Sequence, residues 1–106
     1  MKILFLFCAL LCLAVVAAES GNDEATNFTP KDGFVPNQET AIKIAVAVWE
    51  PIYGAKEIAG EKPYQARLTN GIWLVEGTLP KNHIGGVAEA RIAKNDGRIL
   101  NVSHGK

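Results

Sequence analysis

The dipeptide Asn70-Gly71 constrains the fold of this chain more than any other feature of its sequence. Both central residues of a two-residue type I′ turn need a positive φ angle, which asparagine and glycine tolerate best. Apolar and polar residues alternate on both sides of the dipeptide, from Tyr64 to Gly77. This alternation is typical of strands that each bury one face. We therefore expect a β-hairpin whose register is fixed by its turn.

The turn also determines which side chains of this hairpin share a face. It pairs Leu68 with Trp73 and Ala66 with Val75, so that one face is apolar. We expect that face to enter the core and the other, mixed face to stay open. The pairs on the mixed face are Thr69 with Ile72, Arg67 with Leu74, and Gln65 with Glu76.

A second hairpin closes the chain, with expected strands near residues 86–94 and 98–103. The strands are joined through Asn95-Asp96-Gly97, which offers a loop of two or three residues. The shorter loop would place an isoleucine opposite an asparagine, whereas the longer one places Gly97 in the left-handed region and pairs apolar side chains. We therefore expect the three-residue loop, which gives these pairs: Ile92 with Leu100, and Ala90 with Val102.

An amphipathic helix precedes the hairpins. Asn37 is a suitable N-cap, and apolar residues then recur at the i, i+3, i+4 spacing of a helix with one buried stripe. Pro51 lacks an amide hydrogen and crowds the preceding turn, so we expect the helix to end or kink near Trp49 or Glu50. The stripe consists of Ala41, Ile44, Ala45, Val48, Trp49 and Ile52.

Together these elements predict an α+β fold, in which an N-terminal helix packs on a four-stranded antiparallel meander sheet. We expect both tryptophans to lie in the core, where they would form a large part of it. The helix residues Trp49, Ile44 and Val48 are expected to cover a sheet face lined by Leu68, Trp73, Val75, Ile92 and Leu100.

Residues 1–18 have the layout of a secretory signal peptide. Lys2 precedes an apolar run from Ile3 to Val16, and small residues follow it. The run is shorter than the roughly 20 apolar residues that a membrane-spanning helix needs. We therefore expect cleavage after Ala18 and a periplasmic or secreted protein.

The rest of the chain divides into a tether and a domain. Residues 19–33 are polar and have no apolar period, so we expect a flexible tether ahead of a domain at 34–106. Both cysteines, Cys8 and Cys12, lie in the signal segment, which excludes thiol catalysis and cysteine metal sites from the exported part. The whole chain has 11 basic and 11 acidic residues with interspersed signs. Neither nucleic acid nor, after cleavage, a membrane is indicated as a partner.

The loop GTLPKNHIGG, residues 77–86, joins the two hairpins. Its glycines suit close backbone approach or simple turn geometry. The loop matches neither the Walker phosphate loop nor the dinucleotide-binding fingerprint. His83 has no nearby orienting group for general-base catalysis. It is also far in sequence from His104, without the cysteines or carboxylate cluster that a metal site needs. We therefore expect no catalytic residue, no metal and no cofactor.

Two glutamates next to the loop suggest one further enzymatic interpretation. Glu76 and Glu89 would form an acid pair for sugar chemistry if they met across the sheet. The simpler interpretation is a solvated face, with Glu76 beside Gln65 and Glu89 near Arg91. The chain also offers little material for a substrate cleft beyond the sheet. We therefore expect a small exported binding module rather than an enzyme.

Three segments resemble a bacterial immunity-protein family with a nuclear-transport-factor-two-like fold. They are GFVPNQETAIKIAVAVWEPIYG, KPYQARLTNGIWLVEGTLP and GGVAEARIAKNDGRILNVSHGK, and the resemblance extends over essentially all of residues 33–106. The resemblance implies an α+β fold, which in this short form is also describable as cystatin-like or PepSY-like. It further implies a protein that binds and neutralises a cognate toxin in interbacterial competition. With export, the toxin is expected to attack the cell envelope.

For the toxin contact we predict the loop together with the open sheet face. A rigid loop backed by a partly apolar face suits a blocking interaction, because little loop entropy is lost on binding. The sequence leaves open that the loop only connects the hairpins, with the sheet face covered by a second copy of the chain or by the tether. The predicted contact residues are Leu79, Pro80, Lys81, Asn82, His83, Ile84 and Gly85 in the loop, and Arg67, Ile72, Leu74, Glu76, Glu89 and Arg91 on the sheet.

A different function also fits these residues. A PepSY-like or cystatin-like inhibitor of an exported protease, or a cell-envelope chaperone, would have the same size and the same absence of catalytic motifs. The two classes differ in genetic context, because an immunity protein is expected to be encoded beside its toxin. In either case we expect a monomer or a weak homodimer.

Overall fold

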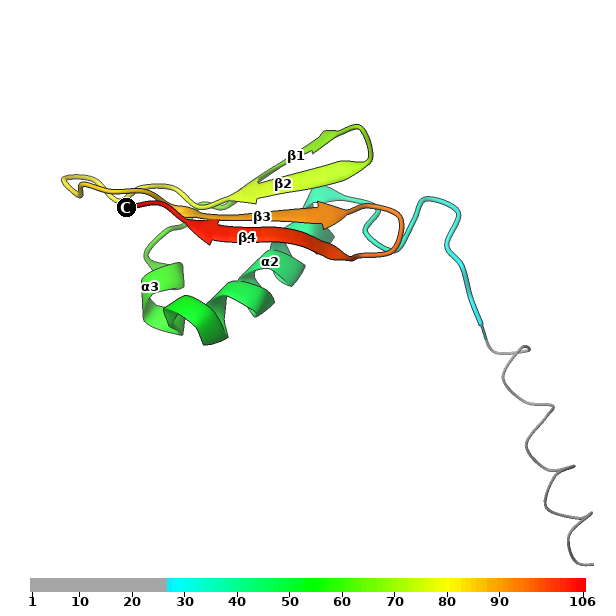
Figure 1. The fold of residues 1–106 in the computed structure, drawn as a ribbon, viewed down its shortest axis with the longest axis horizontal. Coiled ribbons are helices and arrows are strands. Elements are labelled where there is room, and N and C mark those ends of the chain that lie inside the picture. Colours follow the sequence, from blue (N-terminus) through cyan, green and yellow to red (C-terminus); the bar gives the residue numbers. More distant parts are fainter. Residues whose placement is uncertain (1–26) are drawn as a thin grey trace, which may run out of the picture.

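The computed structural model describes residues 27–106, in which a helical layer packs on one sheet (Figure 1). The elements are α2 (Gln38–Tyr53), α3 (Ala55–Ala59), β1 (Gln65–Thr69), β2 (Ile72–Glu76), β3 (Ala88–Ala93) and β4 (Ile99–His104). The four strands pair in sequence order as an antiparallel meander. The predicted α+β architecture is thus confirmed. The predicted signal peptide and the first part of the predicted tether lie outside the described residues.

Helix α2 begins at its predicted cap. The Asn37 side chain accepts a hydrogen bond from the amide of Thr40 at 2.9 Å. This bond satisfies one of the main-chain amides that have no partner in the first turn of a helix.

The end of α2 differs from the prediction, because the helix continues through Pro51 to Tyr53. The expected end near Trp49 or Glu50 was therefore wrong. A proline in the last turn removes only one main-chain hydrogen bond. The turn is still closed by Gly54, whose amide donates to the Glu50 carbonyl at 2.8 Å and whose φ is +97°.

The hairpin of β1 and β2 has the predicted register. Asn70 and Gly71 have φ angles of +50° and +76°, and the predicted pairs from Gln65 with Glu76 to Thr69 with Ile72 are all observed. The prediction for Leu68 was wrong in one respect, since this side chain is 44% exposed and does not line the core. It lies near the hairpin tip on an edge strand, where only one side is covered by a neighbouring strand.

The second hairpin follows the prediction in only part of its length. Ala90 pairs with Val102 as expected, but a register shift makes Ile92 pair with Ile99 instead of Leu100. Leu100 is left over at the shift and is 43% exposed, so its predicted place in the core was wrong.

The loop of this hairpin is also longer than predicted. The Ala93 amide donates to the Arg98 carbonyl at 2.9 Å, which leaves residues 94–97 as the loop. Gly97 has the expected left-handed backbone, with φ +79°. Lys94 is the first residue of this loop, and its amide donates to the Gly71 carbonyl of the first hairpin at 2.9 Å. The longer loop accompanies the register shift between Arg91 and Ile92.

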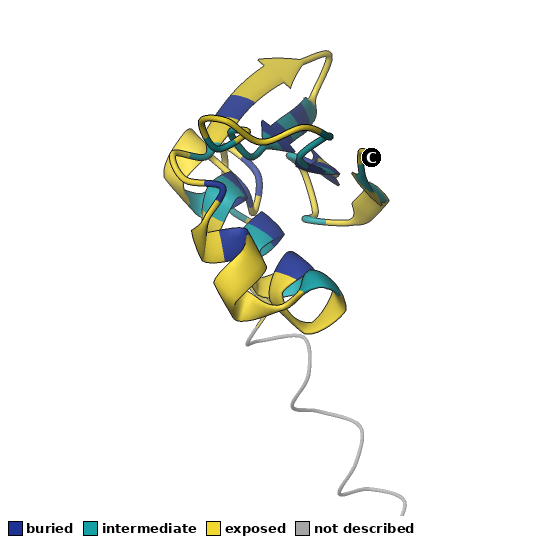
Figure 2. Cartoon of the chain, turned by 90° about the vertical axis from the view of Figure 1, so that its left-hand side faces the viewer, coloured by how far each residue is buried: buried dark blue, intermediate teal, exposed yellow. Residues whose placement is uncertain are grey.

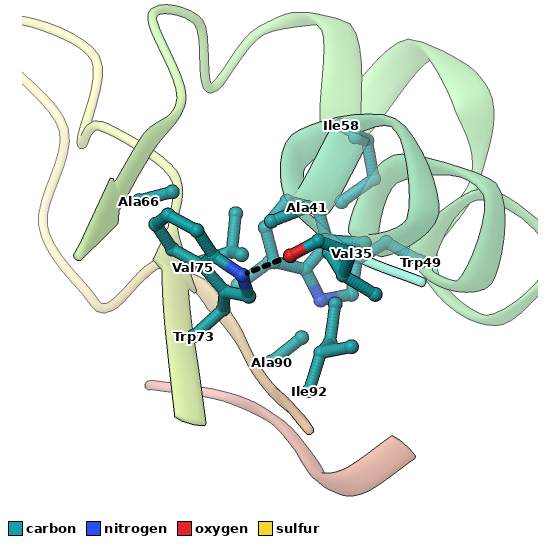
Figure 3. Packing of buried hydrophobic residues seen from close by; sticks show 11 residues of the cluster. Val35, Ala41, Trp49, Ile58, Ala66, Trp73, Val75, Ala90 and Ile92 are labelled. Atoms are coloured by element: carbon teal, nitrogen blue, oxygen red, sulfur yellow. Dashed lines mark hydrogen bonds between the residues drawn. The ribbon is translucent and has the colours of Figure 1, made fainter. Parts of the chain in front are cut away.

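The core lies between α2 and the sheet (Figure 3). Both tryptophans are buried there, as predicted. The indole of Trp73 donates to the Val35 carbonyl at 2.8 Å, and that of Trp49 donates to the Glu89 carbonyl at 3.1 Å. These bonds satisfy the polar atom of each large ring without removing it from the apolar core. The buried apolar residues are Val35, Ala41, Ala45, Trp49, Ile58, Ala66, Trp73, Val75, Ala88, Ala90, Ile92 and Ala93.

Exposed residues form the outer surfaces of the helices and most of the loops (Figure 2). Ile52, predicted to belong to the buried helix stripe, is 57% exposed, because the last turns of α2 diverge from the sheet (Figure 1). Ile58 of α3 fills the core at this end instead, with no exposed surface. Within residues 27–106, no helix has the length and apolar character needed to span a membrane.

Candidate functional site

A hollow of about 710 Å³ lies at the end of the molecule where α3, the loop of residues 77–87 and the last residues of the chain meet (Figure 1). We call it the helix-side hollow. Its wall combines apolar and ionisable side chains, among them Tyr53, Glu57, Glu61, Ile84 and His104.

Glu61 holds both ends of the loop of residues 77–87. Its main-chain carbonyl accepts the amide of Thr78 at 2.7 Å, and its side-chain Oε1 accepts the amide of Ala88 at 2.8 Å. Glu61 is only 1% exposed. A buried carboxylate is tolerated because both of its oxygens have partners. One residue therefore fixes the start and the end of the loop relative to α3.

The glycines of the loop allow backbones and side chains to approach closely. A Cβ atom on Gly77 would lie 2.5 Å from Oε1 of Glu61, and a Cβ on Gly86 would lie 2.2 Å from Cα of Gly105. Neither contact is compatible with a larger residue. The structure therefore favours close approach, one of the two explanations that the sequence left open. Gly85 differs, because its φ of +131° is itself a reason for glycine.

His104, at the end of β4, contacts the other carboxylate oxygen of Glu61. Its Nε2 lies 2.7 Å from Oε2 of Glu61, while its Nδ1 lies 2.8 Å from the main-chain carbonyl of Gly105. The hydrogen bonds to Gly105 and to Glu61 raise the pKa of His104 above its ordinary value, although burial acts in the opposite direction. The ring of Tyr53 packs against the imidazole, with 5.1 Å between ring centroids.

Glu57 extends this pair into a cluster of three potential metal ligands. One ligand atom each from Glu57, Glu61 and His104 lies within 4.8 Å of the other two. This cluster was not predicted from the sequence, where His104 was considered as a metal ligand only together with His83. Glu57 and Glu61 are four positions apart, but Glu61 lies beyond the end of α3, and the contact of both with His104 depends on the fold.

The predicted loop residues border the helix-side hollow. Its lining includes Leu79, Pro80, His83, Ile84 and Gly85, whereas Lys81 and Asn82 form the exposed loop tip. Ile84 is fully exposed, at 102%, and Leu79 is 40% exposed. His83 contacts the Lys81 carbonyl through Nδ1 at 2.9 Å.

The predicted sheet residues lie on the open face of the sheet. Arg67, Ile72, Leu74 and Arg91 line a second hollow of about 310 Å³, which we call the sheet-face hollow. The structure thus divides the predicted contact residues between two hollows. The loop borders the helix-side hollow, and four of the six predicted sheet side chains line the other.

Glu76 and Glu89 do meet across the sheet, as register partners on β2 and β3. Glu76 is engaged by Arg67, whose Nη2 lies 3.3 Å from Oε1 of the carboxylate. Neither glutamate lines the sheet-face hollow. This arrangement matches the solvated face described above better than an acid pair placed around a substrate.

Comparison with known proteins identifies the family. Residues 40–106 match the profile of the family described as NTF2 fold immunity protein, Imm-NTF2-2. The uncharacterized protein YhhH of Escherichia coli (strain K12) is 35% identical to this chain over an alignment of 117 residues, gaps included. The alignment covers 99% of this chain and 92% of that protein. No solved structure gives a significant match. The chain therefore belongs to the NTF2 fold immunity protein family.

Proposed function

We propose that this protein is exported and that it binds and neutralises one cognate antibacterial toxin that acts on the cell envelope. Membership of an immunity protein family supports toxin binding as its role and favours a non-enzymatic function. The layout of residues 1–18 supports export. The envelope follows as the target, because an inhibitor outside the cytoplasm meets only toxins that act there.

The observation that carries the proposal is the preformed loop of residues 77–87. Glu61 binds both ends of this loop. The C-terminal end of the loop is also held by the Gly105 amide, which donates to the Val87 carbonyl at 3.2 Å. A loop that is already ordered loses little conformational entropy when a partner binds. The loop therefore suits insertion into a cleft of the toxin.

The exposed apolar side chains of the loop supply the contact surface. Ile84 has no protection from solvent, and Leu79 of the same loop is partly exposed. Exposed apolar residues on a rigid support are typical of interaction sites, where burial in a partner's pocket provides binding energy. We assign Ile84 as the central contact residue of the loop.

The open sheet face forms the second part of the proposed contact. Arg67 and Arg91 border an apolar floor made by Ile72 and Leu74. Arginines next to apolar side chains are favoured at protein interfaces, since the guanidinium group binds carboxylates and also packs on flat surfaces. This face therefore suits a toxin surface that carries acidic groups around an apolar centre.

A growth experiment tests the proposal. Cells that export the toxin encoded next to this gene are compared with and without the full-length chain, and with a chain that lacks residues 2–18. We expect the full-length chain to restore growth and the shortened chain, produced at the same level, to give no protection. Equal protection by both chains would contradict export. Protection by neither would contradict immunity and favour the protease inhibitor or the envelope chaperone.

A further inference from the structure

We propose that Glu57, Glu61 and His104 bind one divalent metal ion at the wall of the helix-side hollow, and that Zn²⁺ is the ion that fits best. This inference is independent of the proposed function, because it concerns the chain alone. The ligand set of one imidazole and two carboxylates is of the kind that zinc accepts.

The spacing of the ligand atoms suits a small cation. The three atoms lie within 4.8 Å of one another, and the tightest pair, Nε2 of His104 and Oε2 of Glu61, is 2.7 Å apart. Tetrahedral zinc with bonds of about 2.1 Å separates its ligands by roughly 3.4 Å. The tightest pair needs to open by only a fraction of an ångström, and exposed Glu57 is free to rotate inward.

The hydrogen bond from Nδ1 of His104 to the Gly105 carbonyl directs Nε2 toward Glu61. The Gly105 carbonyl can only accept, so Nδ1, 2.8 Å away, carries a hydrogen. In a neutral ring Nε2 then presents its electron pair to Oε2 of Glu61, which is also an acceptor when ionised. Two facing acceptors need a cation between them, either a proton or a metal ion. A carbonyl bonded to the far nitrogen is also the arrangement that orients histidines in metal sites.

Glu61 is oriented in the same manner. The Ala88 amide binds its Oε1 at 2.8 Å, which leaves Oε2 facing His104. A metal ligand with one oxygen held by the main chain is fixed before the ion arrives, so little order is lost on binding. The hollow of about 710 Å³ beside the cluster leaves room for a water molecule as a fourth ligand.

The bound ion would have a structural consequence for the loop. It would link α3, through Glu57, to the end of β4, through His104. Glu61 lies between them and holds both ends of the loop of residues 77–87. The metal would therefore stiffen the support of the loop without entering the proposed contact surface.

Calorimetric titration tests the site. ZnCl₂ is titrated into the mature chain, residues 19–106, prepared without a histidine tag and freed of metal with EDTA. We expect one ion per chain with micromolar affinity. The Glu57→Gln variant should bind at least tenfold more weakly, because it keeps the shape of the side chain and loses a charged ligand. His104→Ala should not bind, whereas His83→Ala, the matched control, should bind like the parent chain.

The contradicting results are equally clear. Absence of binding to the parent chain would show that a proton, and not a metal, bridges His104 and Glu61. Equal binding by the parent chain and Glu57→Gln, with circular dichroism showing that both are folded, would also overturn the proposed site. Toxin binding is measured separately in the presence of EDTA, so that a failure of the metal site and a failure of the immunity function give different results.

Discussion

The imidazole Nε2 of His104 lies 2.7 Å from the carboxylate Oε2 of Glu61, and this contact joins the end of the last strand to the residue that holds both ends of the loop of residues 77–87. The two residues are 43 positions apart in the sequence. The contact therefore connects the C-terminus of the chain, helix α3 and the candidate binding loop. Changes to Glu61 should affect stability and loop order together.

Replacement of Glu61 by alanine should destabilise the domain by about 3 kcal/mol. The substitution leaves the buried Ala88 amide without its acceptor and removes the partner of His104. Urea unfolding of the metal-free chain measures the loss. Glu57→Ala is the matched control, since its exposed carboxylate should change the free energy of unfolding by less than about 0.5 kcal/mol. Equal effects of the two substitutions would contradict the role given to Glu61.

Replacement of Gly86 by alanine should cost about 2 kcal/mol of stability. The new Cβ would lie 2.2 Å from Cα of Gly105, and both backbones would have to move apart. Gly60→Ala provides the comparison, because Gly60 has an ordinary helical backbone, with φ −70°, and its nearest contact would be 3.4 Å away. Thermal unfolding of both variants checks this prediction, and a Gly86→Ala chain as stable as Gly60→Ala would refute it.

Replacement of Ile84 by aspartate should weaken toxin binding at least a hundredfold, which corresponds to about 2.7 kcal/mol, and leave the stability of the free chain unchanged. The side chain is fully exposed, so the folded domain does not depend on it. Ile52→Asp is the control, because Ile52 is 57% exposed on α2 and lies outside the lining of the helix-side hollow. If both variants bind the toxin like the parent chain, the loop is not the contact.

If the open sheet face takes part in the contact, replacement of Arg91 by glutamate should weaken toxin binding about tenfold. This loss corresponds to about 1.4 kcal/mol of binding free energy. The control with the same change of charge is Lys43→Glu on α2; the Lys43 side chain is 76% exposed and, within residues 27–106, forms an ion pair with exposed Glu39. An exposed ion pair contributes less than about 1 kcal/mol, so this control should stay folded. Binding curves at two salt concentrations would show whether the loss is electrostatic. Equal affinity of both variants would restrict the contact to the loop.

The sequence predicted the complete register of the first hairpin because that register depends on two adjacent residues. Asn70 and Gly71 adopt the positive φ angles that they favour, and every pair along the strands follows from the turn. The second hairpin depends on more than its own turn. Its ladder shifts by one residue between Arg91 and Ile92, and Leu100 lies partly exposed at the shift. The turn residues carry no information about a shift farther along the strands.

The candidate site was predictable only where it is local. The sequence identified the loop through its glycines and proline, and the structure gives Gly77 and Gly86 close contacts that explain them. The pairing of His104 with Glu61 joins a strand end to the turn after a short helix, and neither position has a periodic signal. The metal interpretation was set aside because the ligands were sought among neighbours in the sequence. The fold brings them together instead.

The affinity between residues 19–106, the chain without its predicted signal segment, and the proposed toxin, the product of the neighbouring gene, tests the central claim most directly. Calorimetry in the presence of EDTA should give a one-to-one complex with nanomolar affinity, about −12 kcal/mol. The folded state of both proteins is checked by circular dichroism before mixing. A titration without binding at micromolar concentrations, together with unprotected growth of cells that export the toxin, would contradict the assignment of this chain as the immunity protein for that toxin.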